Sequence, residues 1–233
     1  MAKFRNERCV HCLGYFEKLT ADHIFPRAWY PDSTPENIEK WTAPSCFKCN
    51  NDLEKVESDL YLKIGATMDY SDIAASGIAN AAMSRIRPDT TSDLESKARR
   101  TASLKKLIGE VIVKSELPPN LMKNFGPSNG QKVYAGFNVD TDPLTIKIVR
   151  GLEYKLYNKR LVGPGRTINI LNLPERFKNI EGIDQLNAIL KEVGRKEERG
   201  RGFVVEHAMD KFGNTLYYIT IWGRLELWAS VTK

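Results

Sequence analysis

The sequence of 233 residues lacks the features that mark several large classes of protein. No apolar run approaches the roughly 20 residues that cross a membrane, and the first residues have none of the apolar character of a secretory signal. There is also no internal repeat, no Walker motif and no glycine-rich dinucleotide fingerprint. These absences argue against a membrane protein and against the common nucleotide-binding folds. We therefore expect a soluble, cytoplasmic protein without a membrane partner.

Cysteine is scarce, and its placement is informative. Only four cysteines occur, and all stand in two Cys-x-x-Cys pairs, Cys9–Cys12 and Cys46–Cys49. In a chain without a secretory signal, pairs at this spacing are typical of metal ligands rather than disulfides. Four thiolates satisfy tetrahedral zinc and leave no open position, as in structural sites. We predict one structural Zn²⁺ on these residues and expect His11, which lies inside the first pair, not to bind it.

Acidic residues are in the minority overall, but not at the start of the chain. Residues 1–60 hold 8 Lys and Arg against 10 Asp and Glu, a net charge of −2. Residues 61–233 hold 27 against 19, a net charge of +8. A positive field attracts a polyanion, but on charge alone an ordinary solvated surface is the better interpretation. The charge therefore supports nucleic-acid binding only together with a motif.

The segment around the cysteines predicts two short strands and a helix. Residues 19–25 have a strand pattern that Pro26 ends, and residues 40–43 are a candidate partner strand. A helix is expected from Asn50 onward, because apolar residues recur there at helical spacing: Leu53, Val56, Leu60 and Ile64. So few apolar residues could hardly hold this unit together. We therefore expect zinc to supply much of its folding free energy.

Four short stretches follow one another in the first quarter of the chain: Cys9-Val10-His11-Cys12, Asp22-His23-Ile24-Phe25-Pro26, Pro35-Glu36-Asn37-Ile38 and Cys46-Phe47-Lys48-Cys49-Asn50. Each alone would be weak, but their order and spacing together resemble the HNH nucleases of the ββα-metal (His-Me finger) class. The resemblance covers about residues 1–66. It implies a zinc-stapled ββα-metal finger that cleaves phosphodiester bonds.

The resemblance also implies roles for individual residues. His23 would be the general base, which suits an imidazole whose ordinary pKa lies near the operating pH. Asp22 and Asn50 would bind one catalytic divalent cation, Mg²⁺ or alternatively Mn²⁺, through oxygen atoms. Asn37 would restrain the loop between them. Neighbouring strand residues point to opposite faces, so the chain must bend if Asp22 and His23 are to meet at one point.

Several basic residues are candidates for contact with phosphate. Arg27 follows the Asp-His-Ile-Phe-Pro run, and Lys55 lies on the predicted helix. Farther along, Lys97, Arg99 and Arg100 belong to the most basic helical stretch. A solvated surface is as good an interpretation for all five. Asn50 has an alternative role too, as the N-cap of its helix.

The remaining chain predicts a basic helical segment over residues 67–130 and an α+β region of unknown role over residues 131–233. Helices are expected near residues 73–83, near 94–111 after an N-cap at Ser92-Asp93, and near 143–156. Strands are expected at 133–139 and 166–173, with a three-stranded meander in the last 31 residues. The charged run 195–201 reads as a mobile surface loop, and His207 as structural.

Together these observations predict an α+β protein that acts as a metal-dependent HNH endonuclease. DNA is favoured over RNA as the substrate, and a protein partner or oligomer stays open. The resemblance implies a setting in restriction, phage defence or a mobile element. Two alternatives remain. One is a zinc-dependent nucleic-acid-binding protein without cleavage activity, and the other is a protein-interaction module built on zinc.

Overall fold

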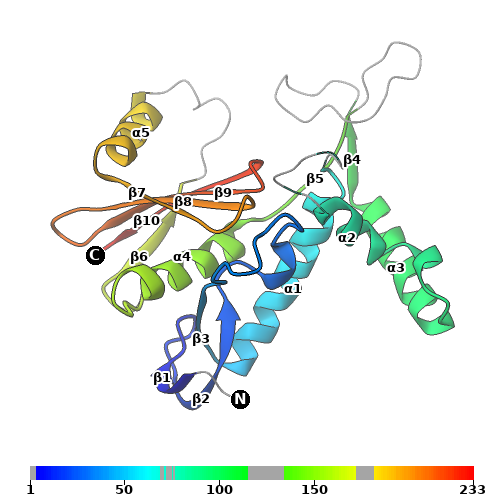
Figure 1. The fold of residues 1–233 in the computed structure, drawn as a ribbon, viewed down its shortest axis with the longest axis horizontal. Helices are drawn as coiled ribbons and strands as arrows, with labels where there is room; N and C mark the ends of the chain where they lie inside the picture. The colour runs from blue at the N-terminus through cyan, green and yellow to red at the C-terminus, as the bar shows by residue number, and fades with distance from the viewer. Residues whose placement is uncertain (1–3, 69–70, 72–74, 76, 115–133, 172–180) are drawn as a thin grey trace.

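The fold is a mixed α+β arrangement whose sheets are antiparallel, as the sequence predicts (Figure 1). The four cysteines lie close together near the N-terminus. No helix in the described part of the chain is long and apolar enough to cross a membrane. The computed structural model describes residues 4–68, 71, 75, 77–114, 134–171 and 181–233.

The first elements are three strands and a long helix: β1 (Phe4–Arg8), β2 (Tyr15–His23), β3 (Thr42–Ser45) and α1 (Phe47–Gly65). The strands form one antiparallel sheet in the order β1-β2-β3. The predicted succession of strand, loop, strand and helix is therefore confirmed. β2 begins earlier than expected because β1 pairs with it from Tyr15 to Leu19, a partner strand that its charged sequence did not reveal.

A helical region follows, with α2 (Ile78–Ser84), the 3₁₀ turn η3 (Pro88–Thr90) and α3 (Leu94–Gly109). The predicted N-cap is confirmed, because the Asp93 carboxylate accepts a hydrogen bond of 2.7 Å from the Ser96 backbone N–H. The predicted extension of α3 to residue 111 is wrong. β4 (Val111–Lys114) begins there and pairs with β5 (Tyr134–Phe137).

Over residues 142–171 and 181–233, the described C-terminal part has two helices and one sheet. Its elements are α4 (Asp142–Leu156), β6 (Thr167–Ile170), α5 (Glu181–Val193), β7 (Arg195–Glu198), β8 (Phe203–Met209), β9 (Thr215–Ile221) and β10 (Leu225–Thr232). The sheet order is β6-β10-β9-β8-β7, which confirms the meander. The mobile loop expected at residues 195–201 is wrong, because β7 pairs with β8 from Arg195 to Glu198.

One hydrophobic core joins the two ends of the chain. A single cluster contains buried residues from the N-terminal unit, such as Ile24 and Trp29, and from the C-terminal part, such as Ile148 and Trp222. The Trp29 and Trp222 rings lie 4.9 Å apart. In Figure 1, α4 runs between the C-terminal sheet and the N-terminal strands, and it contacts α1, β3, β6 and β10. The predicted domain boundaries stay a prediction, but the core is continuous across them.

Candidate metal centre and histidine site

The two cysteine pairs come together where β1, β2 and α1 meet. The four Sγ atoms lie within 4.8 Å of one another, with Cys12 and Cys46 at 3.9 Å. The first pair is shaped by a turn in which the Leu13 N–H donates to the Cys9 carbonyl oxygen at 2.9 Å. The second lies at the start of α1, where Cys46 is the N-cap. Backbone N–H groups of His11 and Cys49 also lie 3.4 Å from the sulfurs of Cys9 and Cys46.

This sulfur arrangement fits zinc. Bonds of about 2.3 Å at tetrahedral angles put sulfur atoms roughly 3.8 Å apart, close to the 3.9 Å between the Cys12 and Cys46 sulfurs. Backbone N–H groups aimed at sulfur stabilise thiolates, the form that binds metal. Cys9 is fully buried and packs with Leu19 and Cys46, whereas Cys12 is exposed, so the centre has one buried side and one side open to solvent. The cysteine cluster predicted from spacing is confirmed, and it is compatible with zinc.

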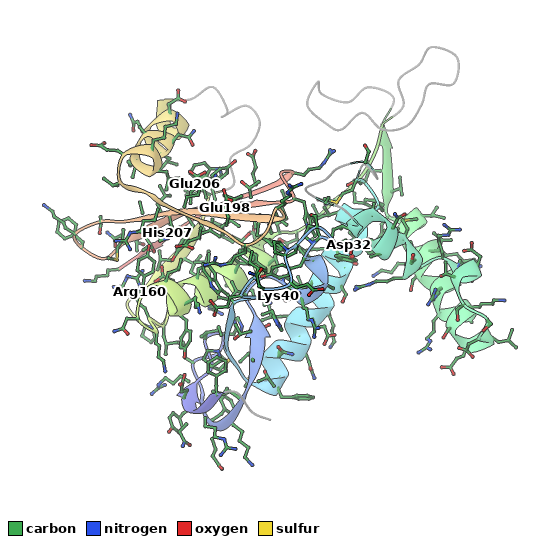
Figure 2. The ribbon with its side chains drawn as sticks, in the orientation of Figure 1. Asp32, Lys40, Arg160, Glu198, Glu206 and His207 are labelled. Atoms are coloured by element: carbon green, nitrogen blue, oxygen red, sulfur yellow. The ribbon has the colours of Figure 1, made fainter. Side chains whose placement is uncertain are left out.

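His23 is the last residue of β2 and is half-buried. Burial lowers its pKa below 6.5; Asp22 opposes this effect, and the charges of Lys147, Arg27 and Lys40 add to it. Figure 2 shows Lys40 near the junction of β2, α1 and α4. At neutral pH the imidazole is therefore uncharged and can accept a proton.

Asp22 points to the other side of β2 and is buried, as the alternation of a regular strand requires. Its Oδ2 atom accepts a hydrogen bond from the His11 imidazole at 2.9 Å, and its Oδ1 atom lies 3.1 Å from the Lys147 Nζ atom. Burial opposes ionisation, but these two contacts outweigh it and hold the pKa of Asp22 below 3.8. Asp22 is therefore an ionised carboxylate that protein groups already satisfy.

Two further residues of this cluster were missed in the sequence. Lys147 on α4 has a side chain only 1% exposed, and it also forms an ion pair with Glu57 on α1. Burial raises the pKa of Glu57, although Lys147 counteracts it. A signal was present for Lys147, which lies within the apolar stripe of its helix beside Leu144 and Ile148. A charge in such a stripe must find a buried partner.

The predicted oxygen ligands do not fit a divalent cation as they lie. Both oxygens of Asp22 face N–H groups, and the positive charge of Lys147 would repel a second cation. Asn50 is half-buried and is the fourth residue of α1. Its backbone N–H donates to the Cys46 carbonyl oxygen at 3.0 Å. The helix is capped by Cys46, not by Asn50. Asn37 is exposed in the loop between β2 and β3.

The five basic candidates differ in how free they are. Arg27 and Lys55 are exposed, and Lys55 has only a loose ion pair with Asp52 at 3.8 Å. Lys97 and Arg99 lie on the exposed face of α3. Arg100 is different, because its guanidinium donates to the Ser84 carbonyl oxygen at 2.9 Å and to the Thr90 hydroxyl. It therefore holds α3 against the preceding turn.

The third histidine belongs to a separate buried network. His207 on β8 and Arg160 after α4 are labelled in Figure 2. The Tyr157 hydroxyl lies 2.6 Å from His207 Nδ1, and Arg160 forms an ion pair with the fully buried Glu153. These contacts fasten α4 to the C-terminal sheet, which agrees with a structural role for His207.

No family model, no curated protein and no solved structure matches the chain.

Proposed function

We propose that the protein is a zinc-stabilised endonuclease of the HNH type that hydrolyses phosphodiester bonds, with DNA as the favoured substrate and His23 as the general base. The observation that carries the proposal is a half-buried histidine at the end of β2, whose pKa is lowered by burial. It lies in a strand–strand–helix unit that four clustered cysteines fasten. The ordered motifs of the first 50 residues support the same assignment.

The reaction that follows is a hydrolysis at phosphorus. A water oxygen attacks the phosphate while His23 takes a proton from that water, and the bond from phosphorus to O3′ breaks. The leaving oxygen takes a proton from solvent, so the products have a 5′-phosphate and a 3′-hydroxyl. A positioned general base contributes about 10²–10⁴-fold to the rate. The resemblance also implies Mg²⁺, but we assign no step to it because the oxygen ligands do not fit.

Exposed basic groups around the unit offer contacts for the polyanion. Arg27 lies next to the histidine site, and its charge contributes to the lowered pKa of His23. Lys97 and Arg99 extend from α3, which projects away from the rest of the fold in Figure 1. Such groups supply affinity without sequence specificity.

A second candidate function has its own supporting observation. Lys147 and His11 already contact both carboxylate oxygens of Asp22. This favours a zinc-dependent nucleic-acid-binding module without cleavage activity. The two functions differ in the role of His23, which is required for cleavage in the first and has no catalytic role in the second.

A plasmid-nicking assay on the full-length protein tests the proposal. Wild type is compared with His23→Ala and with His207→Gln, a control at the distant histidine, after both variants are shown to be folded and zinc-loaded. We expect nicking by wild type and the control, and a 10²–10⁴-fold slower rate for His23→Ala with unchanged DNA affinity. Wild-type nicking by His23→Ala would reject His23 as the general base. No nicking by wild type in Mg²⁺ or Mn²⁺ would leave only the binding function.

A further inference from the structure

One face of α4 is directed at the N-terminal unit. Lys147, Arg150, Gly151 and Tyr154 are spaced as one side of a helix, and each touches a different point of that unit. Arg150 donates to the His11 carbonyl oxygen at 2.7 Å, and the Tyr154 hydroxyl donates to a Glu7 carboxylate oxygen at 2.7 Å. A side chain at Gly151 would clash with Ile24 at 2.8 Å. The C-terminal half therefore approaches the residues around His23 closely.

Lys147 makes the most central of these contacts. Its ammonium group donates to three acceptors on different elements: Asp22 at the end of β2, Glu57 on α1, and the backbone carbonyl oxygen of His23. An ammonium group has three N–H donors, so all of them are used. The side chain is 1% exposed and so cannot reach a bound phosphate.

The charges explain why this contact is stable. The Asp22 and Glu57 side chains are only 10% and 15% exposed, so two neighbouring carboxylates would repel each other if no cation lay between them. Lys147 supplies that cation, and His11 adds a hydrogen bond to the far oxygen of Asp22. An oxygen of Asp22, which the resemblance assigns to a divalent ion, is thus already bound by a side chain of α4.

We propose that Lys147 is a positioning residue for His23 and that Asp22 is its anchor rather than a ligand of a divalent ion. Lys147 fixes the peptide carbonyl of His23 and the carboxylate one residue before it. By the alternation of a strand, the half-buried imidazole is thereby kept on the opposite face of β2. This assigns α4, and through it the C-terminal half, a part in the histidine site. The inference rests on the proposed function for its kinetic consequence but not for its geometry.

The test uses the full-length, zinc-loaded protein and substitutions of matched kind. Lys147→Met is compared with Lys155→Met, which removes an exposed ion pair to Glu39 from the same helix. Nicking should show kcat lowered at least tenfold by Lys147→Met with KM little changed, because a small misplacement of the base costs rate rather than binding. Lys147→Arg, which keeps the charge, should recover part of kcat, and Lys155→Met should match wild type. Wild-type kcat in folded Lys147→Met would overturn the proposal.

Two measurements decide the inference even if no cleavage is found or Lys147→Met does not fold. The first is Mn²⁺ binding followed by electron paramagnetic resonance, on wild type and on Asp22→Asn. An anchor predicts equal Mn²⁺ affinity, whereas a tenfold loss in Asp22→Asn would show that Asp22 is a ligand. The second is the imidazole NMR signal of His23, which should shift in Lys147→Arg and stay in place in Lys155→Met. An unmoved His23 signal in Lys147→Arg would contradict the positioning role.

Discussion

The β2–β3 pair is held differently at its two ends. At one end, Thr20 pairs with Ser45, next to four cysteine sulfurs contributed by residues 9–49 alone. At the other end, His23 pairs with Thr42, and the anchor is Lys147, which lies 124 residues away in the chain. The end at Thr20–Ser45, called the zinc end below, is held by local sequence around a cysteine cluster that is compatible with zinc. The end at His23–Thr42, called the histidine end, is held by tertiary packing.

The difference separates folding from function. The zinc end uses ligands at fixed short spacing, so it can form before the rest of the chain packs. The histidine end is complete only when α4 is in place. His11 connects the two, because it lies within the first cysteine pair and donates to Asp22. Loss of zinc should therefore disturb both ends, whereas loss of the Lys147 contact should disturb only the histidine end.

Removing zinc should give the largest effect. Structural zinc contributes about 10–16 kcal/mol of apparent binding free energy in small zinc units, far more than any single ion pair. We expect a chelator strong enough to extract zinc, or Cys46→Ser, to abolish cooperative melting of residues 4–65. Circular dichroism with zinc analysis measures this, and zinc added back should restore the chelated protein. An unchanged melting curve in zinc-free protein would show that the core alone holds the unit.

The second-largest effect should be the difference in stability between variants of the buried Lys147 and the exposed Lys155 on α4. Removing one partner from a buried ion pair costs about 3–5 kcal/mol, because it leaves a carboxylate without compensation. An exposed pair such as Lys155–Glu39 contributes about 0–1 kcal/mol. Lys147→Met should therefore lower the denaturant midpoint strongly and Lys155→Met hardly at all. Equal losses in the two variants would mean that the Lys147 cluster is not a buried anchor.

Substitutions on the basic face of α3 should change DNA binding and leave both ends of the β2–β3 pair unaffected. Neutralising Lys97 and Arg99 to Gln is expected to lower the salt dependence of DNA binding by about 0.9 per lost phosphate contact, whatever the DNA sequence. Arg100 is left intact, because its contacts with Ser84 and Thr90 hold α3 in place. Fluorescence anisotropy at several salt concentrations measures the slope. A slope equal to that of wild type would mean that this face is only solvated.

The smallest effect is expected at the edge of the α4 contact. Tyr154→Phe removes a hydrogen bond to Glu7 and should cost about 0.5–1 kcal/mol, while Tyr15→Phe at an exposed position should cost nothing measurable. Burial of Glu7 opposes its ionisation, but the Tyr154 and Lys159 contacts outweigh it and lower its pKa below 4.5. The cost of Tyr154→Phe should therefore be present above pH 4.5 and fade as the pH falls through the lower, folded-state pKa. Denaturant melts at pH 7 and pH 3 compare the two.

The zinc end could be predicted from sequence because its information is local. Cysteine spacing identifies the cluster, and the apolar stripe from Leu53 to Ile64 identifies α1. β1 and β7 were missed, since both are short, charged strands whose formation depends on a partner strand.

The histidine end could be predicted only in part. The motif identified Asp22 and His23, but it could not show that Asp22 is occupied by His11 and Lys147. That contact joins residues far apart in the chain, and no periodicity encodes which buried lysine meets which carboxylate. The assignment of Asp22 and Asn50 as ligands and of His23 as base stays a prediction from the resemblance.

Amide hydrogen exchange on zinc-loaded, full-length protein tests the central claim most directly. It compares Lys147→Met, or Lys147→Arg if the first is unstable, with wild type at two places. At the histidine end the probe is the amide of Ile24, whose N–H donates to the Trp41 carbonyl oxygen at 2.9 Å. At the zinc end the probes are the amides of Cys9 and Leu13, whose N–H groups are hydrogen-bonded within the turn of the first cysteine pair. We predict faster exchange at Ile24 and unchanged exchange at Cys9 and Leu13. Equal acceleration at both ends, or none at Ile24, would contradict the claim that α4 holds the histidine end.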